Sequence, residues 1–151
     1  EQAAKKAVAL GYQSALLSIG GNVRAIGNKN GKDYWKVGIQ NPDTQSEDLL
    51  RVEIMDMSVV TSGIYERYYT VGDKNYHHII DPVTLFPADY FKAITIICKD
   101  SGIADGLSTA VFCLPYEQGL ELIDSLPDTQ ALWVMHDGSL KTSKDFNRYV
   151  K

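Results

Sequence analysis

Two adjacent histidines and a nearby aspartate form the first group of residues that could perform acid–base chemistry. They lie in the segment YHHIIDP, residues 76–82. Successive side chains of a β-strand point to opposite faces, so His77 and His78 cannot both face one site if this segment is a strand. A histidine titrates near neutral pH and suits general-base work on a hydroxyl group. The alternative is one surface and one half-buried histidine, with Asp81 opening a turn before Pro82.

A second pair, Asp105 and Thr109, lies within a helix predicted over residues 102–114. Side chains at positions i and i+4 are neighbours on a helix, so their oxygen atoms can converge on one point. A carboxylate with a hydroxyl supplies half a coordination shell for a hard cation such as Mg²⁺. The spacing alone favours the simpler alternative, in which Asp105 lies near a helix N-terminus and Thr109 faces solvent.

The helical wheel divides this predicted helix into two faces. One face carries Ile103, Leu107, Ala110 and Leu114. The other, which we expect to be the polar face, carries Asp105, Ser108, Thr109 and Phe112.

The segment TSGIYERYY, residues 61–69, combines a hydroxyl, a small residue, a cation and several aromatic rings. Arg67 could meet a phosphate, and a tyrosine could stack on a planar ring. The alternative is a hairpin with an ordinary aromatic face. The paired glycines Gly20 and Gly21 allow a close backbone approach. Their spacing is not G-x-G-x-x-G, so no dinucleotide-binding fingerprint is predicted.

Length and composition bound the class of protein. A chain of 151 residues predicts one domain, residues 1–151, with enough length to bury a core. Its net charge is −4 and it has no cluster of basic residues, so we do not expect nucleic acid as a partner. No apolar run reaches the length of a membrane span. The opening segment EQAAKKAVALG has no start methionine, which indicates a fragment or a mature product.

The two cysteines, Cys98 and Cys113, lie in apolar runs without C-x-x-C spacing. We expect buried thiols rather than a zinc site. A disulfide between them stays open at this stage, because it depends on an approach of the two backbones that the sequence does not give.

Strands outnumber helices in the predicted order of elements. Helices are predicted at 1–10, 102–114 and 116–126, and strands at 14–19, 23–27, 33–40, 49–56, 58–63, 65–71, 76–80, 91–99, 130–137 and 139–143. The strand at 14–19 is expected to be buried because it is apolar. Helices inserted in blocks among strands predict an α+β fold with a mixed, largely antiparallel sheet.

Six segments together, in order, resemble successive motifs of the bacterial FAD:protein FMN transferases, the ApbE family. They are LLSIGGNVRAIG, YWKVGIQNP, SVVTSGIYERYY, YHHIIDPVTLFPA, ADGLSTAVF and ALWVMHDG, and they extend from about Gly11 to Gly138. The resemblance implies the ApbE-like fold. It also implies an enzyme that binds FAD and Mg²⁺, passes FMN to a Thr or Ser hydroxyl of a target flavoprotein, and releases AMP. Some relatives mainly hydrolyse FAD to FMN and AMP.

The resemblance also implies roles for individual residues. His78 matches the catalytic histidine, as base toward the acceptor hydroxyl, which leaves His77 as a bystander. Asp105 and Thr109 match the metal ligands. We expect cofactor contacts from Ser62, Gly63, Arg67 and Asp81. Gly20, Gly21 and Asn22 match a turn whose role is conformational.

The chain departs from the family pattern at three positions and in length. Ile64 stands where an acidic residue is usual, Tyr69 ends the aromatic segment, and Leu85 replaces a glycine, so we expect another backbone path there. Family members are about twice as long, which indicates that the amino-terminal half is absent. That half is expected to supply much of the FAD cleft and a signal or lipid-anchoring segment, and the parent protein is expected to be extracytoplasmic. The hypotheses are therefore a transferase, an FAD pyrophosphatase, or a non-catalytic fragment that needs its other half.

Overall fold

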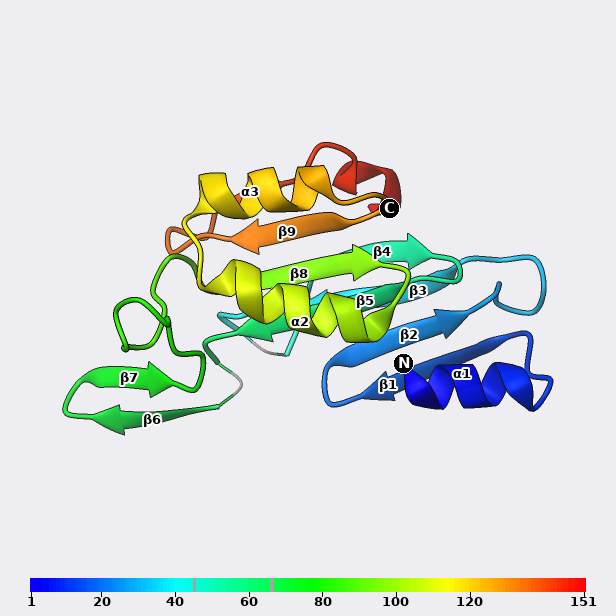
Figure 1. The fold of residues 1–151 in the computed structure, drawn as a ribbon, viewed down its shortest axis with the longest axis horizontal. Helices are drawn as coiled ribbons and strands as arrows, with labels where there is room; N and C mark the ends of the chain where they lie inside the picture. The colour runs from blue at the N-terminus through cyan, green and yellow to red at the C-terminus, as the bar shows by residue number, and fades with distance from the viewer. Residues whose placement is uncertain (45, 66) are drawn as a thin grey trace.

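The computed structural model describes residues 1–44, 46–65 and 67–151, with the backbone alone of Lys74. Its main sheet has six strands in the order β1-β2-β5-β8-β9-β10, and every pairing between neighbours is antiparallel (Figure 1). Their bounds are β1 Ala15–Ile19, β2 Asn22–Ile26, β5 Ser58–Gly63, β8 Ala93–Cys98, β9 Gln130–Val134 and β10 Leu140–Thr142. Two further hairpins pair β3 (Trp35–Gln40) with β4 (Asp48–Ile54), and β6 (Tyr68–Val71) with β7 (Lys74–His77).

Helices complete the fold: α1 (Gln2–Ala9), α2 (Ser101–Phe112), α3 (Tyr116–Ser125) and the short 3-10 helix η1 (Phe146–Tyr149). The predicted α+β class is therefore confirmed, although η1 was not predicted. None of the helices in the described part of the chain is long and apolar enough to cross a membrane.

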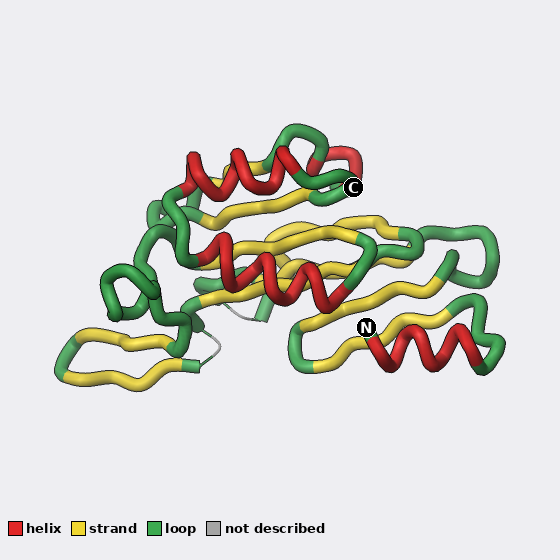
Figure 2. The backbone as a smooth tube through the Cα atoms, in the orientation of Figure 1, coloured by secondary structure: helices red, strands yellow, loops and turns green. Residues whose placement is uncertain are grey.

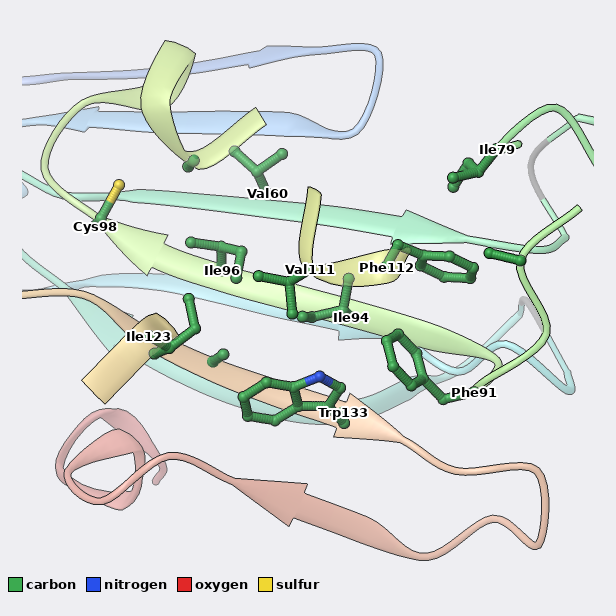
Figure 3. Packing of buried hydrophobic residues seen from close by; sticks show 13 residues of the cluster. Val60, Ile79, Phe91, Ile94, Ile96, Cys98, Val111, Phe112, Ile123 and Trp133 are labelled. Carbon is green, nitrogen blue, oxygen red and sulfur yellow. The ribbon is translucent and has the colours of Figure 1, made fainter. Parts of the chain in front are cut away.

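The central strands are buried on both faces because other elements pack against each face of the sheet. Strands β8 and β9 are buried at every position. Ile94, Ile96 and Trp133 pack with side chains of α2 and α3 (Figure 3), whereas Ile97 and Leu132 pack with the β3–β4 hairpin and η1. Side chains alternate between the faces of a strand, so an uninterrupted apolar run such as AITIIC fills both cores.

The prediction that residues 14–19 form a buried strand is wrong about burial. Strand β1 lies at the edge of the main sheet and pairs only with β2. The side chain of Ile19 is 64% exposed, and Leu16 is also exposed. An edge strand has a sheet neighbour on one side only, so its apolar composition does not by itself determine burial.

The predicted faces of α2 are also wrong. Its buried face carries Ser101, Ala104, Ser108, Val111 and Phe112, and Ile103 is 59% exposed. Phe112 enters the core beside Phe91, with ring centroids 5.0 Å apart. Ser108 tolerates burial because its hydroxyl has hydrogen-bond partners. Asp105 and Thr109 do face solvent, as the wheel predicted.

The segment between β5 and β8 leaves the sheet and returns to it. Gly63 at the end of β5 pairs with Ala93 at the start of β8. Between them the β6–β7 hairpin lies apart from the main sheet (Figure 2). Strand β7 is Lys74–His77, so the predicted strand 76–80 starts too late and extends too far, and His78 begins a loop. The predicted strand 65–71 starts later, at Tyr68, and its residue 66 lies outside the described residues.

Candidate functional site

His77 is a structural residue of the core rather than an accessible base. It is 7% exposed, and its ring meets Phe112 edge-on at 5.7 Å between centroids. Its Nε2–H donates to the carbonyl oxygen of Ala88 at 2.8 Å, and its Nδ1 accepts the amide of Ile79 at 3.3 Å. Burial lowers the pKa of this imidazole from its ordinary value of 6.5. Both nitrogen atoms of His77 are therefore occupied by backbone groups.

His78 has the opposite environment. It is exposed, and its ring Nδ1 lies 3.2 Å from the carbonyl oxygen of Arg67. Since a carbonyl oxygen can only accept, Nδ1 carries the proton. This tautomer leaves the lone pair of Nε2 available to take a proton from another group. The backbone amide of His78 donates to the same carbonyl at 3.2 Å, which fixes the residue against the start of the β6–β7 hairpin.

A cavity of about 560 Å³ lies beside His78 and Arg67. Its remaining lining is mostly aromatic or apolar: Tyr68, Tyr69, Tyr76, His77, Ile80, Leu85, Phe86 and Pro87. The rings of Tyr69 and Tyr76 are cross-strand partners and stack at 5.5 Å with an interplanar angle of 14°. Aromatic walls with a few polar groups are typical of a site for a planar organic ligand.

A second cavity, of about 370 Å³, shares a wall with the first. The shared residues are Tyr68, His77, Phe86 and Pro87, and the second cavity adds Pro42, Ile64, Tyr65, Asn75 and Asp89. Gly63 is next to one of its lining residues, Tyr65: a Cβ on this glycine would lie 2.4 Å from Cε1 of the Tyr65 ring. The absence of a side chain at residue 63 therefore determines where the Tyr65 ring packs.

Asp81 organises residues 81–87, which we call the tip loop. Its Oδ1 accepts the amides of Val83 at 2.7 Å and Thr84 at 3.2 Å, and its Oδ2 accepts the Tyr90 hydroxyl at 3.2 Å. These bonds, the Val83 amide foremost, hold the pKa of the Asp81 carboxyl below its ordinary value. The expected turn-opening role of Asp81 is confirmed. Its predicted contact with a cofactor stays a prediction, and both its oxygen atoms already have partners inside the protein.

Leu85 shows how the tip loop accommodates the replaced glycine. Its φ is +61°, in the left-handed region that glycine enters freely. Its amide donates to the carbonyl of Asp81 at 2.9 Å. The leucine thus adopts a backbone angle suited to glycine, and the expected difference in backbone path from the family stays a prediction.

Ser62 joins the end of β5 to α2. Its hydroxyl lies 2.8 Å from the hydroxyl of Ser108, which donates to the carbonyl oxygen of Asp105 at 2.9 Å. This chain of hydrogen bonds holds the turn that carries Asp105 against the sheet. Ser108 was not predicted as part of the site, because its buried position depends on the packing of α2.

The Asp105–Thr109 pair offers two oxygen atoms to solvent from one face of α2. The Thr109 hydroxyl lies 3.5 Å from the Asp105 carbonyl, as i,i+4 geometry requires. In the described part of the chain the Asp105 carboxylate has no hydrogen-bond or ion-pair partner, and no group of three or more His, Cys, Asp or Glu side chains could hold a metal. Two hard oxygen ligands fit Mg²⁺, which usually keeps waters and substrate phosphates in its shell.

The predicted site residues form two groups rather than one. Arg67 and His78 line the aromatic cavity, and Asp81 shapes its tip loop. Ser62, Asp105 and Thr109 lie along β5 and α2. The last turn of α2 is close to the first group, because the Cys113 thiol lies 3.6 Å from the carbonyl oxygen of Ile80. Cys98 and Cys113 are both free thiols, so the alternative of a disulfide is excluded.

Sequence comparisons identify the family that the chain resembles. The model of the ApbE family matches residues 1–133. An FAD:protein FMN transferase of Treponema pallidum is 41% identical over 140 residues, which are 86% of this chain and 39% of that protein.

Solved structures are similar as well. The ApbE protein of Thermotoga maritima superimposes with a TM-score of 0.90 at 32% identity, over 99% of this chain and 49% of that one. The flavinyl transferase ApbE of Pseudomonas stutzeri gives 0.76 at 33% identity, over 96% and 46% respectively. The chain therefore belongs to the ApbE family, with its fold. It spans less than half the length of these relatives.

Proposed function

We propose that this chain takes part in FMN transfer from FAD to a Thr or Ser hydroxyl of a target flavoprotein, with Mg²⁺ and with release of AMP. The observation that carries the proposal is the Nε2 of His78, which has no hydrogen-bond partner among the described residues and lies at the edge of an aromatic cavity. Relatives named FAD:protein FMN transferases support it. We also propose that the parent protein is extracytoplasmic and lipid-anchored, as the resemblance of the sequence motifs to the family implies.

The cavity residues are suited to bind FAD as the substrate. Aromatic walls suit a planar ring, and the Arg67 guanidinium suits the charge of a phosphate. The two cavities share a wall, so we expect FAD to extend across both of them.

The proton of the acceptor hydroxyl would pass to Nε2 of His78. The hydroxyl oxygen then forms a bond to the phosphorus of the FMN half, the P–O bond to the AMP half breaks, and AMP leaves with that electron pair. His78 returns the proton to solvent, to which it is exposed. A positioned base of this kind typically contributes about 10²- to 10⁴-fold in rate.

Asp105 and Thr109 would hold the metal ion, with phosphate and water oxygens completing its shell. When bound, Mg²⁺ neutralises charge on the phosphoryl oxygens. The hydrogen bonds from Ser62 through Ser108 keep the Asp105 turn in place for this task.

Hydrolysis of FAD to FMN and AMP is the second candidate. It differs only in the hydroxyl that is used, and the solvent exposure of His78 gives water access to the base. A non-catalytic flavin-binding fragment is the remaining alternative.

The test is an incubation of the protein with FAD, Mg²⁺ and an acceptor flavoprotein domain that carries a threonine. Transfer is expected to leave fluorescent flavin on the acceptor band after denaturing electrophoresis, and to release one AMP for each flavin. An acceptor with that threonine changed to alanine is the control. Free FMN and AMP without labelled acceptor would support hydrolysis. FAD binding without any product would support the non-catalytic alternative.

A further inference from the structure

The tip loop has a conformation that its own hydrogen bonds determine. The Asp81 carboxylate accepts the backbone amides of Val83 and Thr84, and the Asp81 backbone carbonyl accepts the amide of Leu85. The two ends of the loop meet in a β-bridge between Ile80 and Pro87. The side chains at the tip therefore project from a fixed backbone.

Leu85 is strained within this loop. Its φ of +61° brings the Cβ of an L-residue close to backbone atoms, which is unfavourable for a leucine. The other non-glycine residues with positive φ in the described part of the chain are Asn30, Asp56 and Asp128, whose short polar side chains tolerate this region. Leucine has no such tolerance.

Hydrogen bonds of the loop backbone hold Leu85 at this angle, but its side chain adds little to them within the described fold. The Leu85 side chain is 76% exposed, so it gains little from burial. It borders the 560 Å³ cavity together with Phe86 and the stacked pair Tyr69 and Tyr76. Strained residues of this kind cluster at active sites and ligand clamps. An apolar side chain fixed at the rim of an aromatic cavity gains free energy when a ring covers it.

We propose that Leu85 is a ring-binding, specificity-determining residue that packs against a planar heteroaromatic ring of FAD in this cavity. The inference rests on the proposed function for the identity of the ligand. FAD carries two such rings, isoalloxazine and adenine, and both have the flat, largely apolar faces that a leucine and tyrosines contact. Arg67 at the same cavity supplies a cation for the phosphates that join them.

Three variants separate the side chain of Leu85 from its backbone. Leu85→Ala removes the side chain and keeps an L-residue at positive φ. Leu85→Gly removes both the side chain and the strain. Val83→Ala is the matched control, since Val83 is an apolar residue of the same loop, 88% exposed, that does not line the cavity.

The measurements are the melting temperature and the Kd for FAD, riboflavin and adenosine, by calorimetry. Leu85→Ala and Leu85→Gly are both expected to weaken FAD binding by about fivefold to tenfold. Leu85→Gly is expected to raise the Tm by about 2 °C while Leu85→Ala leaves it near that of the wild type. If the affinity for riboflavin falls by the same factor as that for FAD, Leu85 contacts the isoalloxazine ring. If the affinity for adenosine falls by that factor, Leu85 contacts the adenine ring.

FAD binding that is unchanged in both Leu85 variants, or weakened equally by Val83→Ala, overturns the inference. The transfer assay keeps this outcome separate from the proposed function. Labelled acceptor with unchanged Kd values contradicts the role of Leu85 and leaves transfer standing. Weakened FAD binding in the Leu85 variants without any labelled acceptor supports the role of Leu85 and contradicts transfer. A wild-type protein that binds none of the three ligands contradicts both.

Discussion

At the scale of single residues, the two adjacent histidines differ through their hydrogen bonds rather than their sequence. His77 has both ring nitrogens bound to backbone inside the core, whereas in His78 only Nδ1 has a hydrogen-bond partner among the described residues. Neighbours with the same side chain therefore have different chemistry, one as a core residue and one as the proposed base.

Replacing His78 by alanine should reduce the rate of FMN transfer far more than it reduces FAD binding. The base is used only after FAD is bound, so kcat is expected to fall about 10²-fold or more while the Kd for FAD changes little. Steady-state kinetics and equilibrium binding of the variant provide the two numbers. An equal loss of rate and affinity would make His78 a binding or structural residue instead.

His77 should make the stability of the protein depend on pH. Its pKa in the folded state lies below 6.5, so the unfolded state binds more protons as the pH falls through that value. Stability is therefore complete above pH 6.5 and decreases below it, with a slope of at most about 1.4 kcal/mol per pH unit.

Urea unfolding at pH 7.5, 6.5 and 5.5 measures this slope. We expect the decrease to be smaller in His77→Gln, which has no titrating group, relative to its own stability at pH 7.5. A His78→Gln variant, altered at the exposed neighbour, serves as the control. The same slope in wild type and His77→Gln would assign the effect to other residues.

At the scale of elements, α2 carries a packing face and an exposed face with Asp105 and Thr109, the proposed metal ligands. Asp100 accepts the amides of Gly102 and Ile103 at its N-terminus, and the Glu1 carboxylate accepts the amide of Ser101. The exposed face is thus held by a capped helix rather than by a loop, which gives Asp105 a fixed position.

Asp105→Asn should weaken metal dependence without weakening the fold. The side chain is exposed and has the same size, so the Tm is expected to stay within about 1 °C, as for surface substitutions in general. The Mg²⁺ concentration for half-maximal activity is expected to rise on the order of tenfold or more. Asp124→Asn, on the exposed surface of α3, is the control. Full activity of Asp105→Asn at the original Mg²⁺ concentration would remove it from the metal site.

Two glycines in helices should respond in opposite ways to the same change. A Cβ at Gly119 in α3 would lie 2.8 Å from Cγ1 of Val111 in α2, so Gly119→Ala is expected to cost about 1–3 kcal/mol. A Cβ at Gly106 in α2 meets no atom within 4 Å, so Gly106→Ala is expected to stabilise by about 0.5–1 kcal/mol. Chemical denaturation of both variants checks the pair, and effects of the same sign would contradict the packing of α3 on α2.

The sequence predicts the elements better than their surroundings. The apolar run AITIIC is long and unbroken enough to identify a central strand, and Gly72 at φ +60° closes the predicted β6–β7 turn. In contrast, the edge position of β1 and the buried face of α2 depend on which elements pack against them. For the site, local spacing placed Asp105 and Thr109 on one face of a helix, and the family resemblance selected them as candidate metal ligands. The bond from Tyr90 to Asp81 and the strain at Leu85 are properties of the folded loop, which no local pattern shows.

At the scale of the whole molecule, the sheet separates two hydrophobic cores. Consecutive residues of β8 belong to different cores, with Ile96 facing the helices and Ile97 facing the β3–β4 hairpin. The two cores therefore share a backbone but not a set of side-chain contacts.

Ile96→Val and Ile97→Val should each cost about 0.5–1.5 kcal/mol, because each removes one buried methylene group. Their effects are expected to add within about 0.5 kcal/mol in the double variant, since the two side chains have no shared neighbours. Equilibrium unfolding in urea of the single and double variants measures this. A larger interaction energy would show that the backbone of β8 transmits repacking from one face to the other.

The departure of the chain between β5 and β8 has a consequence for how such a protein diversifies. Gly63 and Ala93 are sheet partners, and the Ile64 amide donates to the Lys92 carbonyl at 3.0 Å, so segment 64–92 starts and ends at one place. That segment carries Arg67, His78 and Leu85. The strands on either side of it, β5 and β8, pair directly with each other in the main sheet. Substitutions or insertions in segment 64–92 can therefore change the residues proposed to bind the ligand while β5 and β8 stay paired. The ends of the segment are already held together, so a change in its length adds little closure entropy. The residues proposed to recognise the ligand are thus grouped on one stretch of the chain, which also contributes His77, Ile79, Ala88 and Phe91 to the buried interior.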